Sequence, residues 1–209
     1  MIRVACFIDG FNLYHSLKRL KAQHLKWVDL HKLMCRQIAA RSERVSAVYY
    51  FSAFADWLPA ERQRHEEYVR ALESTGVQPI LGQFKEKDRS CKTCGAHWKG
   101  HEEKETDVNI ALWLINEAYR DTYDKALIVS RDSDLKPALQ MVRSQFAEKE
   151  LTVVAPPNSG HSNDLIGVAH SKRKITVAQV ADCLFPQQVL CPTNGTVLAT
   201  RPAKFDPPP

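Results

Sequence analysis

The chain has 209 residues, of which 44% are hydrophobic and 25% charged, a composition typical of a soluble globular protein with a substantial core. No apolar run approaches the roughly 18 residues that a membrane helix requires, and the opening MIRVACFIDG is too short and too interrupted by Asp9 for a signal peptide. We therefore expect a cytoplasmic protein with no membrane partner, in which six cysteines do not form a disulfide framework. The net charge of +5 permits a polyanionic partner without establishing one.

Apolar runs alternate with amphipathic segments along most of the chain and predict strands and helices. In chain order these are strand 4–9, helix 12–23, helix 27–40, strand 45–54, helix 60–76, strand 77–84, helix 106–120, strand 125–130, helix 134–146, strand 150–156 and helix 164–170. Asn12 is expected to cap the first helix and Gly76 to end the third. Pro79 favours an edge position for its strand.

Strands that alternate with helices of this length predict βαβ units, and hence an α/β three-layer sandwich with a mostly parallel central sheet. We expect one domain over residues 1–170. The polar stretch 85–104 has no clear period and is expected to be an inserted loop. Residues 171–209 are expected to form a C-terminal extension, largely irregular at its end, with a disordered tail at 201–209.

Carboxylates stand at comparable positions of this predicted fold. Asp9 ends the first strand, Asp132 and Asp134 follow the strand 125–130, and Asp107 opens a helix. The carboxyl ends of parallel strands share one edge of the sheet, so these side chains could converge although they lie far apart in the sequence. Gathered carboxylates repel one another unless a cation offsets the repulsion, and an all-oxygen ligand set suits Mg²⁺ or Mn²⁺. The sequence therefore predicts an acidic metal site suited to phosphoryl chemistry.

Each aspartate also has an ordinary structural explanation. Asp132 or Asp134 could cap the helix that follows, Asp9 could belong to a turn, and Asp107 could interact with a helix macrodipole. The metal site is favoured because several aspartates occupy the same kind of position in one parallel fold. Cys6, within the first strand, is expected to be a small buried hydrophobe.

Three separate blocks, FIDGFNLYHSL, EEKETDVNIALWLINEAY and YDKALIVSRDSDLKPAL, resemble the NYN domain (LabA-like) family, a branch of the PIN-like nucleases. The resemblance covers roughly residues 1 to 170 and implies a PIN-like sandwich, a Mg²⁺- or Mn²⁺-dependent ribonuclease site and RNA, single-stranded in the simplest case, as the substrate. The residues that match the family motifs are Asp9 and Asn12 of D-G-x-N, Lys104 and Asp107 of K-x-x-D, and Asp132 and Asp134 of D-x-D.

The chain departs from the family pattern beside the last motif. The family commonly has Ser-Gly-Asp-Ser-Asp-Phe, whereas this sequence has Arg131 in place of the glycine and Leu135 in place of the phenylalanine. Arg131 adds a cation that could bind phosphate or occlude the site. Further candidates for substrate contact are Ser130 and Asn163, the latter flanked by His161 and Asp164.

The stretch CKTCGAHWKGH has the spacing C-x2-C-x2-H-x3-H and offers a candidate zinc site. Its four possible ligands are Cys91, Cys94, His97 and His101. The histidine spacing is tighter than in zinc fingers, so the alternatives are completion by another residue or by a second subunit in a homodimer, a plain reduced loop, or a redox pair. An ordered loop here would shape the approach to Asp107 and place Trp98 and nearby lysines where RNA could stack and dock.

The predicted function is hydrolysis of RNA phosphodiester bonds by water that one or two divalent ions activate. Asn12 would orient a phosphate or a ligand carboxylate, and Lys104 would contact the scissile phosphate or steady the acids. One rival is an RNA-binding or regulatory module that keeps the acidic pocket without turnover. The other is an aspartate-based phosphatase with Asp9 as its nucleophile, for which the sequence offers no partner motif.

Overall fold

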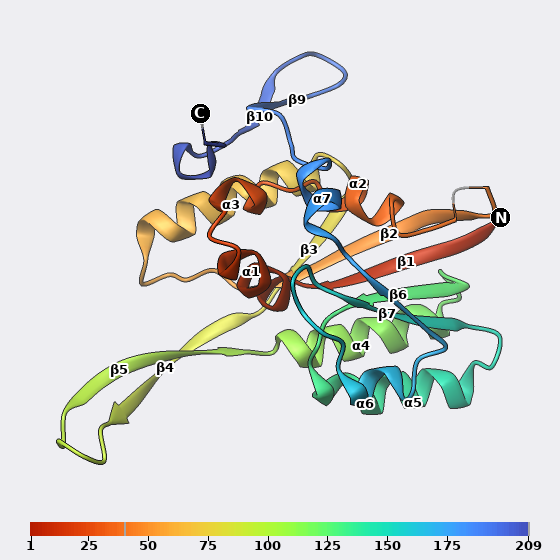
Figure 1. The fold of residues 1–209 in the computed structure, drawn as a ribbon, viewed down its shortest axis with the longest axis horizontal. Helices are drawn as coiled ribbons and strands as arrows, with labels where there is room; N and C mark the ends of the chain where they lie inside the picture. Colours follow the sequence, from red (N-terminus) through yellow and green to blue (C-terminus); the bar gives the residue numbers. More distant parts are fainter. Residues whose placement is uncertain (40, 209) are drawn as a thin grey trace.

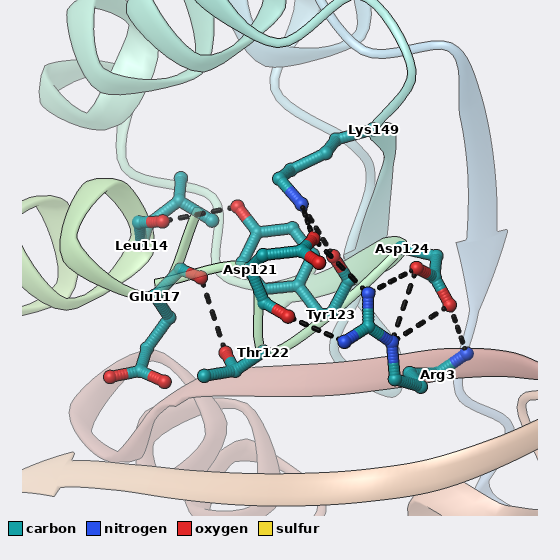
Figure 2. Close-up of polar contacts among 8 residues, drawn as sticks. All are labelled: Arg3, Leu114, Glu117, Asp121, Thr122, Tyr123, Asp124 and Lys149. Carbon is teal, nitrogen blue, oxygen red and sulfur yellow. Dashed lines mark hydrogen bonds and ion pairs between the residues drawn. The ribbon is translucent and has the colours of Figure 1, made fainter. Parts of the chain in front are cut away.

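The computed structural model describes residues 1–39 and 41–208 and places six parallel strands in one central sheet, in the order β3-β2-β1-β6-β7-β8 (Figure 1). The strands are β1 (Ile2–Asp9), β2 (Glu43–Ser52), β3 (Val77–Leu81), β6 (Lys125–Val129), β7 (Glu150–Ala155) and β8 (Ser171–Lys174). Every pairing within this sheet is parallel, which confirms the predicted α/β class. At their amino ends Arg3 of β1 pairs at 2.6 Å with Asp124, which directly precedes β6 (Figure 2). Because β1 and β6 are neighbours, their carboxyl ends meet at the same edge of the sheet.

Helices cover both faces of the sheet (Figure 1). One face carries α1 (Gly10–Arg19), α2 (Leu30–Cys35), α3 (Pro59–Glu73) and α7 (Val177–Ala181); the other carries α4 (Thr106–Tyr119), α5 (Lys136–Gln145) and α6 (Asn163–Ile166). The alternation of side chains along β1 builds both layers, since Val4, Cys6 and Ile8 enter one buried cluster while Ala5 and Phe7 enter the other. Burial on both faces explains why this strand is an uninterrupted apolar run.

Tertiary contacts shorten two of the predicted helices. The segment 27–40 contains only α2, because Val28 forms an isolated bridge with Leu184 and the amide of Asp29 donates to the carbonyl of Cys183 at 2.8 Å. The last predicted helix, 164–170, is reduced to the single turn of α6. Residue 40 lies outside the described part of the chain.

Residues 83–104 form a two-stranded antiparallel hairpin, β4 (Gln83–Ser90) and β5 (His97–Lys104), which projects from the body of the protein (Figure 1). The expectation of a loop was therefore wrong. Most residues of this arm are exposed, so the apolar alternation that marks a half-buried strand is missing. Cross-strand ion pairs support the ladder instead, with Lys87 3.2 Å from Glu102 and Lys99 2.7 Å from Asp88.

The C-terminal segment is joined to the core. The expected domain boundary at residue 170 falls before β8, which pairs with β7 as the sixth strand of the sheet. A second hairpin, β9 (Gln188–Leu190) and β10 (Val197–Thr200), and a short helix, η3 (Ala203–Phe205), follow. Phe205 packs against the core, so the prediction of a disordered tail was wrong there, and residue 209 lies outside the described range. Among the described helices, none has both the length and the apolar character needed to cross a bilayer.

Candidate acidic active site

Asp9 is fixed by the junction between β1 and α1. It is the last residue of the strand and also the N-cap of the helix, since its Oδ1 accepts a hydrogen bond from the backbone amide of Asn12 at 2.9 Å. The expectation that Asn12 caps this helix was wrong, because the helix begins at Gly10. The Asn12 side chain instead donates through Nδ2 to Oδ2 of Asp9. Asn12 therefore orients the carboxylate that precedes it.

Gly10 allows this junction to be tight. A Cβ atom at this position would lie 2.6 Å from the carbonyl oxygen of Phe51 and 2.7 Å from the ring of Tyr50. No larger residue fits without movement of β2, so the glycine lets α1 start directly against the neighbouring strand. The close approach sets the direction in which Asp9 points.

A chain of hydrogen bonds joins the end of β1 to the end of β6. The hydroxyl of Ser130 donates to Oδ2 of Asp9 at 2.8 Å and accepts from the backbone amide of Asp132 at 3.0 Å. Oδ1 of Asp132 in turn accepts from the amide of Asp134 at 2.9 Å and caps the short helix η2 (Ser133–Leu135). Ser130 is buried and committed to these partners, so its predicted contact with substrate is replaced by a positioning role toward Asp9.

The aspartates share one electrostatic environment. Asp9 is only 2% exposed, and burial raises its pKa, with a further rise from the charge of Asp132. Hydrogen bonds from Asn12 and Ser130 oppose that rise in the pKa. Half-buried Asp107, in the first turn of α4, has a pKa raised to about 6, first by burial and then by the charges of Asp132, Asp9, Glu103 and Asp134. The charges of the other three aspartates predicted from the sequence therefore all act on the pKa of Asp107.

Glu103 is an acidic neighbour that sequence reasoning missed. It lies near the end of β5, and its Oε1 accepts a hydrogen bond from the backbone amide of Thr106 at 3.0 Å, at the start of α4. No capping pattern of the sequence marks Glu103, because the N-cap of α4 is Glu105. Adjacent Lys104 forms an ion pair with Glu102 at 3.2 Å, and among the described residues it makes no ion pair with Asp107. The predicted contact of Lys104 with the acids is therefore not present in this arrangement.

The remaining substrate candidates follow the carboxyl ends of β6 and β7. Arg131 is exposed directly after Ser130 and has no ion-pair partner within residues 1–39 and 41–208. Asn163 opens α6, while adjacent Asp164 pairs with Lys136 at 2.8 Å. His161 hydrogen-bonds the carbonyl of Arg173 at 2.8 Å. Arg131 thus adjoins the hydrogen-bonded chain of the acidic site in sequence, and α6 packs against η2, the short helix that this chain caps.

The four-ligand zinc site does not form within the chain. Cys91 and Cys94 lie in the turn of the arm and His97 opens β5, but His101 stacks face to face on Trp57 with ring centroids 3.7 Å apart. An extended strand places residues four apart about 13 Å from each other, which is too far for one ion. In the described ranges, no three His, Cys, Asp or Glu side chains are arranged to hold a metal ion.

The four aspartates likewise form no group of three metal ligands among the described residues. Their charges nevertheless act on the pKa of Asp107. Their donor chemistry nevertheless fits a hard divalent cation. The candidate ligands are carboxylates, and their hydrogen-bond partners are an amide and a hydroxyl. The raised pKa of Asp107 reflects first its burial and then the repulsion of neighbouring carboxylates, which such a cation would remove.

This repulsion makes a prediction for the metal-free protein. Because the folded-state pKa of Asp107 is about 6, above its ordinary value, its contribution to stability is complete below about pH 4 and is lost as the pH rises through about 6. The change in the free energy of unfolding caused by Asp107→Asn should therefore be more favourable at pH 7 than at pH 4. The expected difference is about 1 kcal/mol after allowance for solvent screening.

Urea unfolding in EDTA at the two pH values would measure this difference, and NMR titration of the carboxyl carbons would give the pKa directly. Asp132→Asn should lower the pKa of Asp107, because among the neighbouring charges that of Asp132 raises this pKa most. An unchanged Asp107 pKa in that variant would contradict the shared environment.

Comparison with known proteins supports the assignment of the fold. The chain is 28% identical over 228 aligned residues to "6-hydroxy-3-succinoylpyridine 3-monooxygenase HspA" of Pseudomonas putida, and the match covers 90% of this chain and 72% of that protein. A crystal structure of a protein of unknown function from Vibrio parahaemolyticus superposes with a TM-score of 0.58 at 21% identity, covering 88% of this chain and 96% of the other. The family model described as NYN domain matches residues 3–175. The chain therefore belongs to the NYN domain family, which has the PIN-like nuclease fold.

Proposed function

We propose that the protein is a Mg²⁺- or Mn²⁺-dependent ribonuclease that hydrolyses RNA phosphodiester bonds at the acidic site. The observation that carries the proposal is the pKa of Asp107, which burial and then the charges of Asp132, Asp9, Glu103 and Asp134 raise to about 6. Repulsion among these charges costs folding free energy, and a bound divalent cation would offset that cost. Membership of the NYN domain family supports nuclease chemistry at this edge of the sheet.

In the proposed mechanism, Asp9, Asp107, Asp132 and Asp134 hold one or two Mg²⁺ or Mn²⁺ ions. When bound, the ion supplies positive charge to the phosphate oxygens and makes a nearby water more acidic. Asn12 and Ser130 keep the Asp9 carboxylate in one orientation through their hydrogen bonds. The protein's own groups thus preorganise a site in which negative charge can develop on a phosphate.

Two basic residues are the candidates to position the RNA backbone. Arg131 is exposed next to the acids and, with no described ion pair, is available to form a forked pair with a phosphate of the substrate. Lys104 would first have to exchange its ion pair with Glu102 for one with the substrate. Asn163 opens α6, which packs against η2, and is retained as a candidate for contact with the RNA.

The experiment that tests the function is cleavage of an end-labelled, mixed-sequence single-stranded RNA by the full chain in Mg²⁺, Mn²⁺ or EDTA. Cleavage should depend on the added metal, disappear in EDTA and return when the metal is restored in excess. Cleavage that is insensitive to EDTA would contradict the proposal. Binding of the RNA with no cleavage in any metal would favour the regulatory module, and release of phosphate from a phosphomonoester would favour the phosphatase.

The match to a protein named as a monooxygenase over 90% of this chain favours one further candidate, oxygenation of a hydroxylated pyridine. A monooxygenase consumes one O₂ and two reducing equivalents and adds one oxygen atom to its substrate. The chain should be incubated in air with 6-hydroxy-3-succinoylpyridine and a reduced nicotinamide, with mass spectrometry of the products. Because the position named for oxygenation, C3, already bears the succinoyl group, the expected product carries a hydroxyl in place of that group, which leaves as a separate four-carbon fragment. Such products, in a preparation that does not cleave RNA, would replace the ribonuclease proposal.

A further inference from the structure

The arm β4–β5 and the C-terminal hairpin β9–β10 end in the same turn. In both, the glycine amide donates to the carbonyl of the first cysteine at 2.9 Å, from Gly95 to Cys91 and from Gly195 to Cys191. The amide of that cysteine closes the turn on the carbonyl five residues further on, at 2.8 Å in each case. Both glycines have a left-handed backbone, with φ of +70° and +72°. The sequences of the two turns are CKTCG and CPTNG.

This turn directs backbone donors at a sulfur atom. The backbone amides of Cys94 and Thr93 donate to the sulfur of Cys91. The corresponding amides of the second turn act in the same way on Cys191. Amide donors favour the thiolate, which is the form of cysteine that binds metal ions. The cysteines of both turns are free thiols at the surface.

The two turns differ in how many sulfur ligands they offer. The first presents Cys91 and Cys94, whereas the second has Asn194 in the place of the second cysteine. No further His, Cys, Asp or Glu of the described residues joins Cys91 and Cys94 in a group of three. A structural zinc site takes four ligands, so the tip of the arm is half of a site.

The arm holds this half-site away from the sheet (Figure 1). Each strand of the arm has 8 residues, which corresponds to about 25 Å of extended chain. Its root is held to the body by Trp57, whose ring packs edge-on against Phe84 and stacks on His101. The tip is therefore accessible to another molecule while its base stays in place.

The charges of the arm are only partly paired. Lys87 and Lys104 both pair with Glu102, and Lys99 pairs with Glu86 and Asp88. Among the described residues Lys85, Arg89 and Lys92 make no ion pair, so the arm keeps some basic charge. Docking of RNA by these lysines stays a prediction, and the sulfur atoms are the distinctive chemistry of the tip.

We propose that the arms of two copies of this chain meet at their tips and share one Zn²⁺, bound by Cys91 and Cys94 of each copy. A two-fold contact brings identical surfaces together, so two half-sites complete one tetrahedral set of four sulfurs. The four thiols release their protons to solvent as the four Zn–S bonds form, and nothing is oxidised or reduced. A site shared with the second turn would offer only three sulfurs, which is why the symmetric pairing is favoured.

The test measures zinc content and molecular mass on the full chain, purified without chelators and without a polyhistidine tag. Elemental analysis should give one zinc per two chains, and light scattering should give the mass of a dimer. Removal of zinc with a strong chelator should yield the monomer, and readdition of Zn²⁺ alone should restore the dimer. The variant Cys94→Ser should lose both the zinc and the dimer.

The second turn supplies a matched control, because Cys191→Ser alters a thiol in the same backbone and should change neither zinc content nor mass. Thermal unfolding of both variants would verify that they are folded. Because the exposed tip makes no contribution to the core, both should unfold near the wild-type temperature. Several results would overturn the proposal: a dimer that survives Cys94→Ser, one zinc bound per monomer, or zinc-free protein with a Cys91–Cys94 disulfide. None of these results depends on whether the acidic site cleaves RNA.

Discussion

Asp132→Asn is expected to reduce metal-dependent RNA cleavage by at least about a hundredfold without unfolding the protein. The substitution removes one negative charge from the acidic site, and the loss of about 3 kcal/mol of transition-state stabilisation corresponds to that factor. The asparagine oxygen can still accept the hydrogen bond that the amide of Asp134 donates, so the short helix η2 keeps its cap. Initial rates on labelled RNA at saturating Mg²⁺ or Mn²⁺ would measure the effect.

Asp9→Asn should give a loss of the same order for the same reason, since asparagine is also a good N-cap for α1. Asp182→Asn is the control, because this aspartate lies on the surface beside Arg36, 3.4 Å away, and should leave the rate unchanged. Full activity in both site variants would show that Asp9 and Asp132 are only helix caps and that cleavage, if present, occurs elsewhere.

The convergence of the acids could be predicted because it follows from topology. Asp9 and Asp132 follow strands whose apolar runs are unmistakable, and neighbouring parallel strands must end at the same edge. A capping role was foreseen as the alternative for Asp132, whereas Asp9 was assigned to a turn and its cap was not foreseen; the structure shows both caps in addition to the shared charge. A carboxylate can cap a helix and still belong to an acidic site, because each cap uses a single oxygen atom.

Glu103 and the arm escaped prediction for one physical reason. The signal for a strand in a sequence is alternation between a buried and a solvated face, and both faces of the arm are largely solvated. Without β5 there was no basis for placing Glu103 and Lys104 on opposite faces of one strand. For the same reason His97 and His101 were grouped with the cysteines. A compact loop could bring these side chains together, whereas the extended strand β5 keeps His101 away from Cys91 and Cys94.

The long helix expected at 27–40 failed for a different reason. Leu30, Leu33 and Met34 do follow a helical period and are fully buried in α2. The residues just before them hydrogen-bond to the C-terminal segment, where the amide of Phe185 donates to the carbonyl of Trp27 at 3.0 Å. A contact between segments so distant in sequence leaves no local trace, and it replaced the first turn of the expected helix.

That contact leads to the largest expected effect on stability, which is the loss of about 3 to 5 kcal/mol of the free energy of unfolding in Trp27→Ala. The indole is fully buried, with its ring centroid 5.9 Å from that of Tyr68 and 5.7 Å from that of Phe185. Its Nε1 donates to the carbonyl of Pro186 at 2.9 Å, so the alanine would open a cavity and also leave that carbonyl without its partner. Urea unfolding followed by circular dichroism would measure the change.

Trp98→Ala provides the control, since this tryptophan is 50% exposed near the tip of the arm and its loss should change stability by no more than about 0.5 kcal/mol. Limited proteolysis adds a second readout. If the Trp27 ring attaches the C-terminal extension to the core, Trp27→Ala should speed proteolytic cleavage within the segment that follows residue 182. An unaltered unfolding midpoint in Trp27→Ala would mean that the extension folds as a separate unit. A lowered midpoint with one cooperative transition would mean that the sheet and the C-terminal segment fold together, and that truncation at residue 170 removes part of the core.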